Sequence, residues 1–388
     1  MAHAPVIIVN PTAGAGRAAR VVPWLRTRVA TSPGAELHVT RDAGEAEALA
    51  ASAAQGGCER VVAVGGDGTV QAVLNGLLGV SRGTELGVLP VGTGNDLARS
   101  LGLPVVADEA WRVATGPSTR RIDVARARNG EGRERWFASA GGIGFDAQVA
   151  AAMATRRGWR GGRAGYLLTT LAELRRFENQ RITMTVDGVP GEHQVLLVAI
   201  ANGAYYGGGM RIAPDAQPDD GLLDLCLVGD ISRLTAIRQL PNLYRGTHVR
   251  HPAVSMHVVA RSLLVEGDGG TRVHLDGEPF GGLPLEVVLE PAALSVAVPA
   301  QPVTGSVTEQ AAIDEDDRPA GAPRRTGRSD GVAAGMAVAF PPSLWRRRPC
   351  GRRRCWLGQS AYSGQWGALG SAMADVSPVT ARRASMRP

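Results

Sequence analysis

The sequence predicts an α/β domain followed by an antiparallel, β-rich domain, and two observations carry this prediction. In the first part of the chain, three short apolar runs each lead into a turn of small residues and then into a helical pattern. From Arg120 to about Val298, strand-like runs follow one another closely, separated by Gly, Pro and Asp turns. Sustained periodicity is lost after residue 300. We therefore expect an α/β domain at 1–125, a β-rich domain at 126–300 and a disordered tail at 301–388.

The first strand–turn–helix unit opens the chain. Pro5–Val9 is a strand-like run, Asn10–Gly16 is a turn of small residues, and a helix is expected from Ala18 onward. The run Glu36–Thr40 predicts the next strand. Its last residue, Thr40, would therefore lie at the carboxyl edge of the sheet.

The second unit contains the most informative motif, Gly65–Thr69 (GGDGT). It stands between the apolar strand Val61–Val64 and the helical pattern Val70–Leu78. Backbone N–H groups of such a turn can surround a phosphate, and the N-terminus of the following helix favours negative charge. A carboxylate repels phosphate unless a cation lies between them, so Asp67 suggests a nucleotide site that works with a divalent metal. An ordinary tight turn is the alternative.

The third unit repeats this order. The run Val88–Val91 leads into Gly92–Asp96, and a helix is expected to start at Asn95 or Asp96. Simple helix capping is the alternative explanation of these two side chains. Parallel strands bring three such turns to one edge of a sheet, where open α/β folds bind ligands. Together the turns predict a ligand site.

The β-rich domain is predicted from a series of apolar or alternating runs. Helical patterns interrupt the series at Asp146–Thr155, Ala164–Phe177 and Ser232–Tyr244. The expected strands are Ile122–Ala127, Trp136–Ala140, Arg181–Val186, Gln194–Ala201, Leu222–Val228, Val254–Val259, Ser262–Val265, Val273–Asp276, Leu285–Leu289 and Leu294–Val298.

Two acids near the end of this domain form a candidate catalytic motif. In Val273–Pro279, strand alternation places His274, Asp276 and, if the strand continues through Gly277, Glu278 on one face. One carboxylate of such a pair can accept a proton from a hydroxyl while the other holds a metal or tunes its pKa. A solvated strand end is the alternative. His274 is expected to be a local hydrogen-bonding partner or a surface residue.

A second acidic segment is the loop Pro214–Asp224. Acids this crowded cannot pack together without a cation or solvent between them, and oxygen-rich loops suit Mg²⁺ or Ca²⁺. A polar loop before the strand Leu222–Val228 explains the composition equally well. The acids are Asp215, Asp219, Asp220 and Asp224.

These segments, in this order and spacing, resemble the catalytic domain of diacylglycerol kinases, which bacterial lipid kinases, sphingosine kinases and ceramide kinases share. The resemblance covers residues 1 to about 300. It implies a Rossmann-like three-layer nucleotide domain, an antiparallel β-sandwich domain and an active site in the cleft between them. The implied reaction is transfer of the γ-phosphate of ATP to a lipid hydroxyl, with diacylglycerol as the first choice of acceptor. The matching segments are Asn10–Gly14, Gly65–Thr69, Gly92–Asp96, Gly142–Ala147, Pro214–Asp224 and Asp276–Pro279.

The resemblance also implies roles for individual residues. Asp276 and Glu278 would provide the catalytic base, and which of the two takes the proton is left open. Asp67 would bind Mg²⁺ indirectly beside the phosphates of ATP. A structural Mg²⁺ would be held by the side chain of Asp220 and the carbonyls of Gln217 and Leu222. The implied nucleotide-binding residues are Asn10, Pro11, Thr12, Ala13, Gly14, Thr40, Gly65, Gly66, Asp67, Gly68, Thr69, Thr93 and Asn95.

One departure from the family pattern keeps other functions open. Family members usually continue the GGDGT motif with x-Asn-Glu, whereas this chain has Gln71 and Ala72. The lost carboxylate fits a catalytically weak nucleotide-binding regulator, which would bind ATP without turnover. An NAD kinase-like phosphotransferase with a soluble acceptor is the other alternative, although Gly142–Ala147 and Pro214–Asp224 match the lipid branch.

The composition restricts both mechanism and location. The chain contains no lysine, so its 42 basic residues are all arginine, which excludes the catalytic lysines of Walker A proteins and protein kinases. The four cysteines do not suggest a disulfide framework, and no signal peptide or membrane span is apparent. We expect a cytoplasmic protein that reaches its lipid substrate by peripheral contact at the inner membrane surface. No nucleic acid partner is expected, and a homodimer is left open.

Two basic segments are candidates for contact with anionic lipid. The whole net charge of +6 lies in the tail, where Trp345–Trp356 contains an arginine cluster; a non-homologous extension is the alternative. Arg156–Tyr166, followed by Arg175 and Arg176, interleaves arginines with aromatic residues. This pattern suits a membrane surface as well as a solvated helix face.

Overall fold

The computed structural model describes residues 4–80, 83–155 and 162–300, which all belong to one compact unit, Met1–Arg318. The predicted tail at 301–388, with its arginine cluster, lies outside the described residues. The same holds for residues 156–161 of the basic segment that starts at Arg156.

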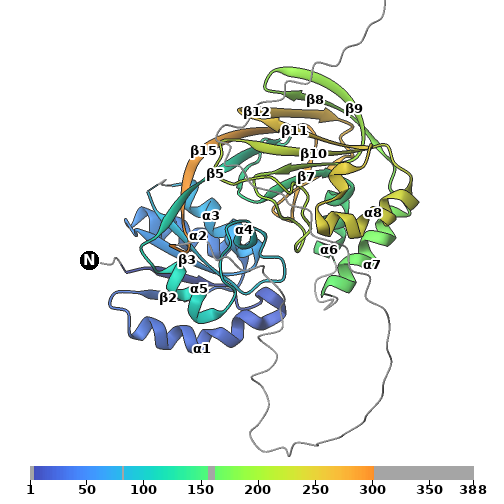
Figure 1. Ribbon diagram of the computed structural model, residues 1–388. Coiled ribbons are helices and arrows are strands. Elements are labelled where there is room, and N and C mark those ends of the chain that lie inside the picture. The colour runs from blue at the N-terminus through green and yellow to red at the C-terminus, as the bar shows by residue number, and fades with distance from the viewer. Residues whose placement is uncertain (1–3, 81–82, 156–161, 301–388) are drawn as a thin grey trace, which may run out of the picture. The chain divides into compact units, whose positions relative to one another are not determined.

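The first half of the described chain is an α/β domain of three layers (Figure 1). Its parallel strands have the order β4-β3-β1-β2. Helices α1 and α5 cover one face of this sheet, and α2, α3 and α4 cover the other. The strands are β1 (Val6–Val9), β2 (Glu36–Val39), β3 (Arg60–Gly65) and β4 (Glu85–Pro90). The helices are α1 (Arg17–Ala30), α2 (Ala43–Gln55), α3 (Asp67–Leu78), α4 (Asp96–Ser100) and α5 (Ala107–Ala114).

The strand order places the ligand site. The connection from β1 leads to one side of the sheet, towards β2, whereas β3 and β4 follow on the other side. The order therefore reverses between β1 and β3, and a crevice at the carboxyl ends of the strands is expected at such a switch point. The turns after β1, β3 and β4 share this edge, as predicted.

Helix α2 was absent from the predicted elements. Its sequence, AGEAEALAASAAQ, is rich in alanine and has a single large apolar residue, so it shows little contrast between its two faces. A local signal was nevertheless present at its start. The side chain of Asp42 accepts a hydrogen bond from the N–H of Glu45 at 2.8 Å, which is a helix N-cap.

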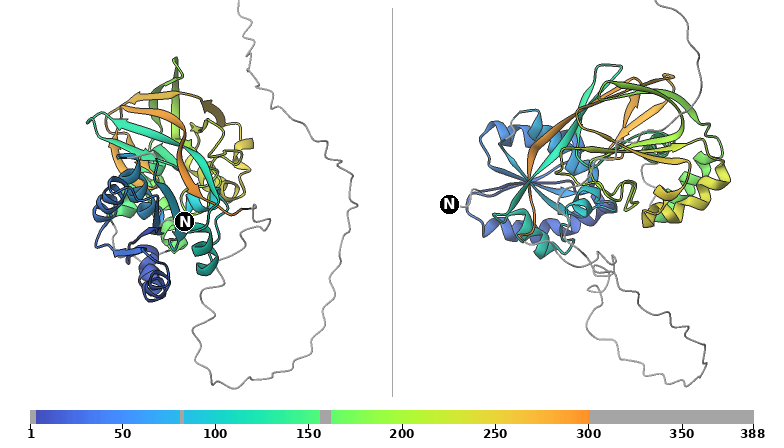
Figure 2. Two further views of the ribbon diagram at one scale, coloured as in Figure 1. Left: turned by 90° about the vertical axis from the view of Figure 1, so that its left-hand side faces the viewer. Right: turned by 45° about the horizontal axis from the view of Figure 1, so that its top comes forward.

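The second half is an antiparallel β-sandwich. Apolar side chains on the inner faces of its strands form one core, and α6, α7 and α8 cover a second core on the outside (Figure 2). The strands are β5 (Thr119–Asn129), β6 (Glu134–Phe137), β7 (Ala140–Gly144), β8 (Gln180–Val186), β9 (Val189–Ala201), β10 (Leu223–Gly229), β11 (Val254–Val259), β12 (Ser262–Gly267), β13 (Arg272–Leu275), β14 (Glu278–Gly282) and β15 (Leu285–Ala297). The helices are α6 (Phe145–Thr155), α7 (Gly162–Leu174) and α8 (Arg233–Arg245). None of the described helices is long and apolar enough to cross a membrane.

One strand connects the two halves. The predicted strands Leu285–Leu289 and Leu294–Val298 are a single strand, β15, whose pairing with β5 shifts register between Glu290 and Leu294. The N–H of Ala292, inside this irregularity, donates to the carboxylate of the buried Asp123 at 2.7 Å. Beyond it, β15 lies parallel to β4. The hydrogen-bonded sheet is therefore continuous through both halves.

Candidate active site

A cavity of about 1070 Å³ has the turns of the parallel sheet on one wall and the β13–β14 hairpin on the other. Of the residues predicted from the sequence, the wall of turns contains Asn10, Thr12, Ala13, Gly14, Gly66, Asp67, Gly68, Thr69 and Thr93. The hairpin wall contains Asp276 and Glu278. The structure thus brings together nine of the thirteen implied nucleotide-binding residues and both candidates for the base.

Four implied nucleotide-binding residues do not line this cavity: Pro11, Thr40, Gly65 and Asn95. The buried hydroxyl of Thr40 donates to the carbonyl of Val9 at 3.2 Å, so it stabilises the end of the strand pair. Gly65 lies directly against the side chain of Thr69, which leaves no room for a Cβ atom. Asn95 has a left-handed backbone, with φ of 53°. Thr40, Gly65 and Asn95 thus shape the turns without lining the cavity.

Asp67 joins two of the turns through the backbone. It is the first residue of α3, and its two carboxylate oxygens accept the N–H groups of Asn95 at 2.8 Å and Asp96 at 2.6 Å. These N–H groups begin α4, so an acid from the second turn caps the helix of the third. The capping alternative for Asn95 is wrong, because its side chain makes no cap hydrogen bond.

Asp67, Asp96 and Asp276 form an acidic group, in which Asp96 is buried while Asp67 and Asp276 are half-buried and line the cavity. Burial raises the pKa of Asp67, which the N–H groups of Asp96 and Asn95 partly oppose. Burial and then the nearby charge of Asp67 raise the pKa of Asp96 to about 7. Asp96 also accepts the N–H of Gly208 at 3.3 Å. A nearby cation would favour the ionised forms of these acids, because it would offset the repulsion between them.

The hairpin corrects one prediction. Strand β13 ends at Leu275, and Asp276 and Gly277 form a two-residue turn with φ of 47° and 86°. Left-handed backbone at both positions is the geometry for which Asp-Gly is favoured in hairpins. The strand therefore does not continue through Gly277, and Asp276 and Glu278 do not share a strand face.

The turn holds the Asp276 carboxylate against backbone N–H groups. It accepts hydrogen bonds from Ser139 and Ala140 at 3.0 Å and from Ala138 at 3.2 Å. Burial raises the pKa of Asp276 to about 6, although the three N–H groups act in the opposite direction. Glu278 is exposed by comparison, and its carboxylate approaches the backbone of Gly68 on the facing wall.

His274 is buried, so the prediction that it is a surface residue is wrong and the prediction that it is a hydrogen-bonding partner is confirmed. The N–H of Gly277 donates to its Nδ1 at 3.3 Å. Its Nε2 therefore carries the proton and faces the carboxylate of Asp146 at 3.3 Å. Gly142 lies against both side chains, with no space for a Cβ atom. This buried pair supports the turn from behind.

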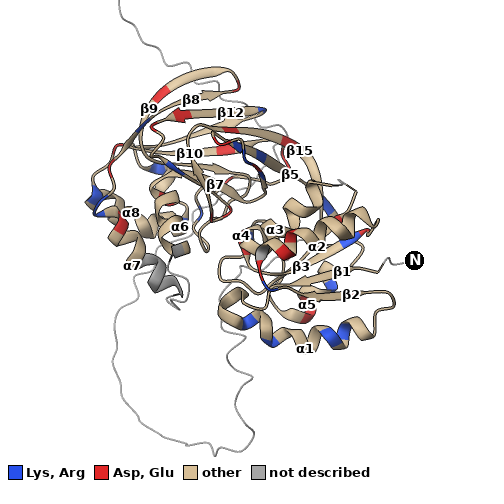
Figure 3. Cartoon of the chain, turned by 180° about the vertical axis from the view of Figure 1, so that it is seen from behind, with Lys and Arg blue, Asp and Glu red and all other residues tan. Residues whose placement is uncertain are grey.

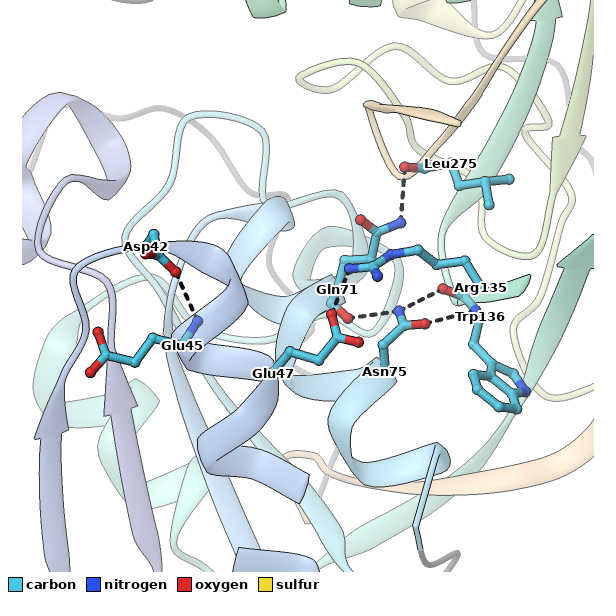
Figure 4. Close-up of polar contacts among 8 residues, drawn as sticks. All are labelled: Asp42, Glu45, Glu47, Gln71, Asn75, Arg135, Trp136 and Leu275. Carbon is cyan, nitrogen blue, oxygen red and sulfur yellow. Dashed lines mark hydrogen bonds and ion pairs between the residues drawn. The ribbon is translucent and has the colours of Figure 1, made fainter. Parts of the chain in front are cut away.

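Three polar contacts link the helices of the first half to the strands of the second (Figure 4). Gln71 donates its side-chain N–H to the carbonyl of Leu275 at 3.0 Å. The Asn75 side chain exchanges two hydrogen bonds of 2.9 Å with the backbone of Trp136. Near the surface, Arg135 pairs with Glu47 at 2.8 Å. Gln71, the departure from the family pattern, thus contacts Leu275, the last residue of β13, directly before Asp276.

Sequence reasoning missed the arginines of the site. Arg41, Arg133 and Arg135 line the cavity. Arg17 donates to the carbonyls of Gly14 at 3.1 Å and Gly92 at 2.9 Å, so it ties the first turn to the third. The only available signal was the absence of lysine, which leaves arginine as the cation for any phosphate site in this chain.

The acidic loop lies apart from the cavity. Its backbone is held by the buried Asp123, which accepts the N–H of Gly221 at 2.7 Å. The Asp220 carboxylate accepts the N–H of Leu222 at 3.2 Å, and Asp219 pairs with Arg120 at 3.8 Å. Within the described part of the chain, no group of three or more His, Cys, Asp and Glu side chains is arranged to hold a metal ion.

Residues 4–127 match the diacylglycerol kinase catalytic domain, and residues 139–298 match the YegS C-terminal NAD kinase beta sandwich-like domain. A diacylglycerol kinase of Mycobacterium tuberculosis is 36% identical over 260 residues, which are 66% of this chain and 82% of that protein. The chain belongs to the diacylglycerol kinase family. Another family member, a probable lipid kinase (YegS-like) of Chromohalobacter salexigens, is 33% identical over 268 residues, 68% of this chain and 83% of that protein.

A solved structure of a diacylglycerol kinase from Bacillus anthracis has the same fold. Its TM-score is 0.62 at 27% identity, and the match covers 77% of this chain and 98% of that one. Both halves of the described chain, and not the nucleotide half alone, are thus shared within the diacylglycerol kinase family.

Proposed function

We propose that this member of the family is an ATP- and Mg²⁺-dependent lipid kinase that converts diacylglycerol to phosphatidic acid. One observation supports the proposal above all: Asp276 and Glu278 face the Gly-rich turns across one cavity. A base on one wall and a phosphate-binding surface on the other are what phosphoryl transfer to a hydroxyl requires. The mycobacterial relative is named a diacylglycerol kinase, which favours this acceptor.

The wall of turns would bind the phosphates. Gly66 and Gly68 flank the start of α3, where backbone N–H groups and the helix dipole favour negative charge. Gly92 and Gly94 carry no side chains on this wall, and Thr93 lies between them. Because the chain lacks lysine, Arg41, Arg133 and Arg135 are the cations that this cavity offers.

Mg²⁺ fits the chemistry of the acids beside the cavity. Asp67 and Asp96 lie close together with raised pKa values, and a divalent cation would relieve their repulsion. Asp67 would hold the ion through water, and bound Mg²⁺ supplies charge stabilisation to the phosphates. In the acidic loop, the Asp220 carboxylate and the carbonyls of Gln217 and Leu222 offer oxygen ligands for a second, structural ion.

Asp276 is the better candidate for the base. A base works best when its pKa is close to the working pH, and burial raises that of Asp276 to about 6. Its three N–H partners fix the position of the carboxylate while a lone pair stays available for a substrate hydroxyl. Glu278, more exposed and close to Gly68, would instead lie at the phosphate end of the site, where a cation must separate it from the phosphates.

The test is transfer of labelled γ-phosphate from ATP to an extract of the host's lipids, with Mg²⁺. Asp276→Asn should lower turnover by about 10²–10⁴-fold, and Glu278→Gln should lower it less. An amide at position 276 turns an N–H group toward that of Ala138, so thermal unfolding of each variant must be compared with the wild type. A labelled, organic-soluble product would then be identified by mass spectrometry.

Two results would contradict the proposal. ATP binding without any phosphorylated lipid or soluble product would indicate a nucleotide-binding regulator. Phosphorylation of NAD in place of lipid would indicate an NAD kinase-like enzyme. Fractionation of cells completes the test, because a cytoplasmic enzyme acting at the inner membrane surface should be released from membranes without detergent.

A further inference from the structure

Helix α8 (Arg233–Arg245) presents an apolar stripe to solvent. The exposed fractions of Leu234, Ile237 and Tyr244 are 55%, 40% and 42%, and Pro241 is exposed as well. Successive spacings of three, four and three residues place these side chains on one side of the helix. Large apolar residues on a solvent-facing helix side are unusual, because that side normally carries polar residues.

The opposite side of α8 is already covered. Ala236 and Leu243 pack on the core that α6 and α7 share with the sandwich. At the start of the helix, Arg233 donates to the carbonyl of Phe177 at 3.2 Å, just after α7. Figures 1 and 2 both show α7 and α8 side by side on the outside of the sandwich. The exposed stripe is therefore not needed for the packing of α8.

Arginines border the stripe. Arg238 and Arg245 lie along one edge of it and Arg233 along the other, and the helix contains no Asp or Glu. The nearest preceding acid, Asp230, accepts a hydrogen bond from Asn179. Over the described chain as a whole, acidic and basic residues are interspersed (Figure 3). The charge of α8 is thus a local feature of this helix.

We propose that α8 is the surface by which this protein docks on an anionic lipid bilayer. The inference rests on the proposed function, since a lipid acceptor requires contact with a bilayer. Leu234 and Ile237 would enter the boundary between headgroups and acyl chains, with Tyr244 at headgroup level. Arg238 and Arg245 would pair with lipid phosphates. A second copy of the chain is a poorer partner, because a symmetric contact would bring the same arginines together.

The first test is flotation of the full-length protein with vesicles of phosphatidylcholine, with and without phosphatidylglycerol. Leu234→Glu/Ile237→Glu should weaken binding to the anionic vesicles by about tenfold or more, since it replaces the apolar stripe with repelling charge. The matched control is Val105→Glu/Val189→Glu, which adds the same charge at exposed apolar positions outside α8. It should bind like the wild type. All variants keep the tail, so its contribution is common to them.

A second variant tests the charges alone. Arg238→Gln/Arg245→Gln keeps the apolar stripe and changes only exposed groups, so it remains informative if the glutamate variant fails to fold. Each arginine near an anionic surface is worth about fivefold in binding. The loss should appear only on vesicles that contain phosphatidylglycerol, and added salt should reduce it.

Activity on a short-chain, water-soluble diacylglycerol separates this inference from the proposed function. Weaker vesicle binding with unchanged turnover of the soluble acceptor would support both. Weaker vesicle binding without any lipid phosphorylation would support docking and contradict the kinase. Both α8 variants floating like the wild type would overturn the docking proposal. So would a wild-type dimer in gel filtration that Leu234→Glu/Ile237→Glu converts to a monomer, since the stripe would then bind a second copy.

Discussion

One wall of the cavity consists of turns at the ends of parallel strands, whereas the other is the tip of an antiparallel hairpin. In the first wall the glycines leave space for a ligand, and a single acid, Asp67, joins two turns through their backbone N–H groups. In the second wall, the paired side chains of His274 and Asp146 fill the space behind the backbone. Glycine thus serves binding in the first wall and packing in the second.

The largest effect on stability is expected in the hairpin wall, where side chains pack tightly behind the backbone. Gly142→Ala would drive a Cβ atom into both Asp146 and His274, which are buried and cannot move away. We expect a loss of about 3 kcal/mol or more in the free energy of unfolding, measured with urea. Gly269→Ala, on an open loop with no atoms near its Cβ position, should stay within about 0.5 kcal/mol of the wild type. Equal stability of both variants would contradict this account of the hairpin.

The connection between the walls comes next. Asn75→Ala leaves the part-buried N–H and carbonyl of Trp136 without their Asn75 partner, and we expect a cost of about 1–3 kcal/mol. Glu47→Gln breaks the half-exposed ion pair with Arg135 in the same region and should cost less than about 1 kcal/mol. Urea unfolding of the two variants measures the difference. If Glu47→Gln proved the costlier, surface charge and not the hydrogen bonds of Asn75 would join the two halves.

Substitutions in the wall of turns should change ATP binding and not stability. Gly68 lies in the first turn of α3, and a Cβ atom there would approach only the flexible end of Glu278, at 2.9 Å. Gly68→Ala should leave the melting temperature unchanged or raise stability by up to about 1 kcal/mol, while ATP affinity falls about tenfold or more. Calorimetric titration with ATP checks this, with Gly56→Ala at the end of α2 as the control. Tight ATP binding by Gly68→Ala would show that phosphates do not approach this backbone.

The smallest effect separates the two candidate bases by pH. With a pKa of about 6, Asp276 is charged above pH 6, so turnover should rise to a plateau there and fall about tenfold for each unit below it. Glu278→Gln should show the same decline in turnover below pH 6. The same raised pKa means that the folded state binds the proton more tightly than the unfolded chain. The contribution of Asp276 to stability is therefore greatest below about pH 4 and declines as the pH rises toward 6. If the decline in turnover below pH 6 disappears in Glu278→Gln, then Glu278 and not Asp276 is the base.

The two walls also differ in how far the sequence predicts them. The turns are contiguous, and the strands before them are uninterrupted apolar runs, so their place at one sheet edge follows from local pattern. The contacts of Asp67 cannot be predicted from local pattern, because its partners belong to the next turn and depend on how β3 and β4 align. Arg17 escaped prediction for the same reason, since its acceptors lie in two different turns.

The hairpin wall was predicted less well. Its residues were identified through the family resemblance, while the strand pattern placed Asp276 and Glu278 on one face. The dipeptide Asp276-Gly277 is itself a strong hairpin signal, and reading it as such would have ended the strand at Leu275. The pair formed by His274 and Asp146 joins positions 128 residues apart in the chain, and no local pattern encodes that contact.

Strand β15 has a consequence for how the protein is made. It is the last described strand, yet it pairs with β4, which precedes it by about two hundred residues. During synthesis the first half must therefore emerge with the edge of β4 uncovered until nearly the whole described chain has left the ribosome. Such an edge can pair with other chains, and contacts this distant in sequence form slowly. Expression of residues 1–125 alone should accordingly yield an aggregation-prone fragment rather than a working nucleotide domain.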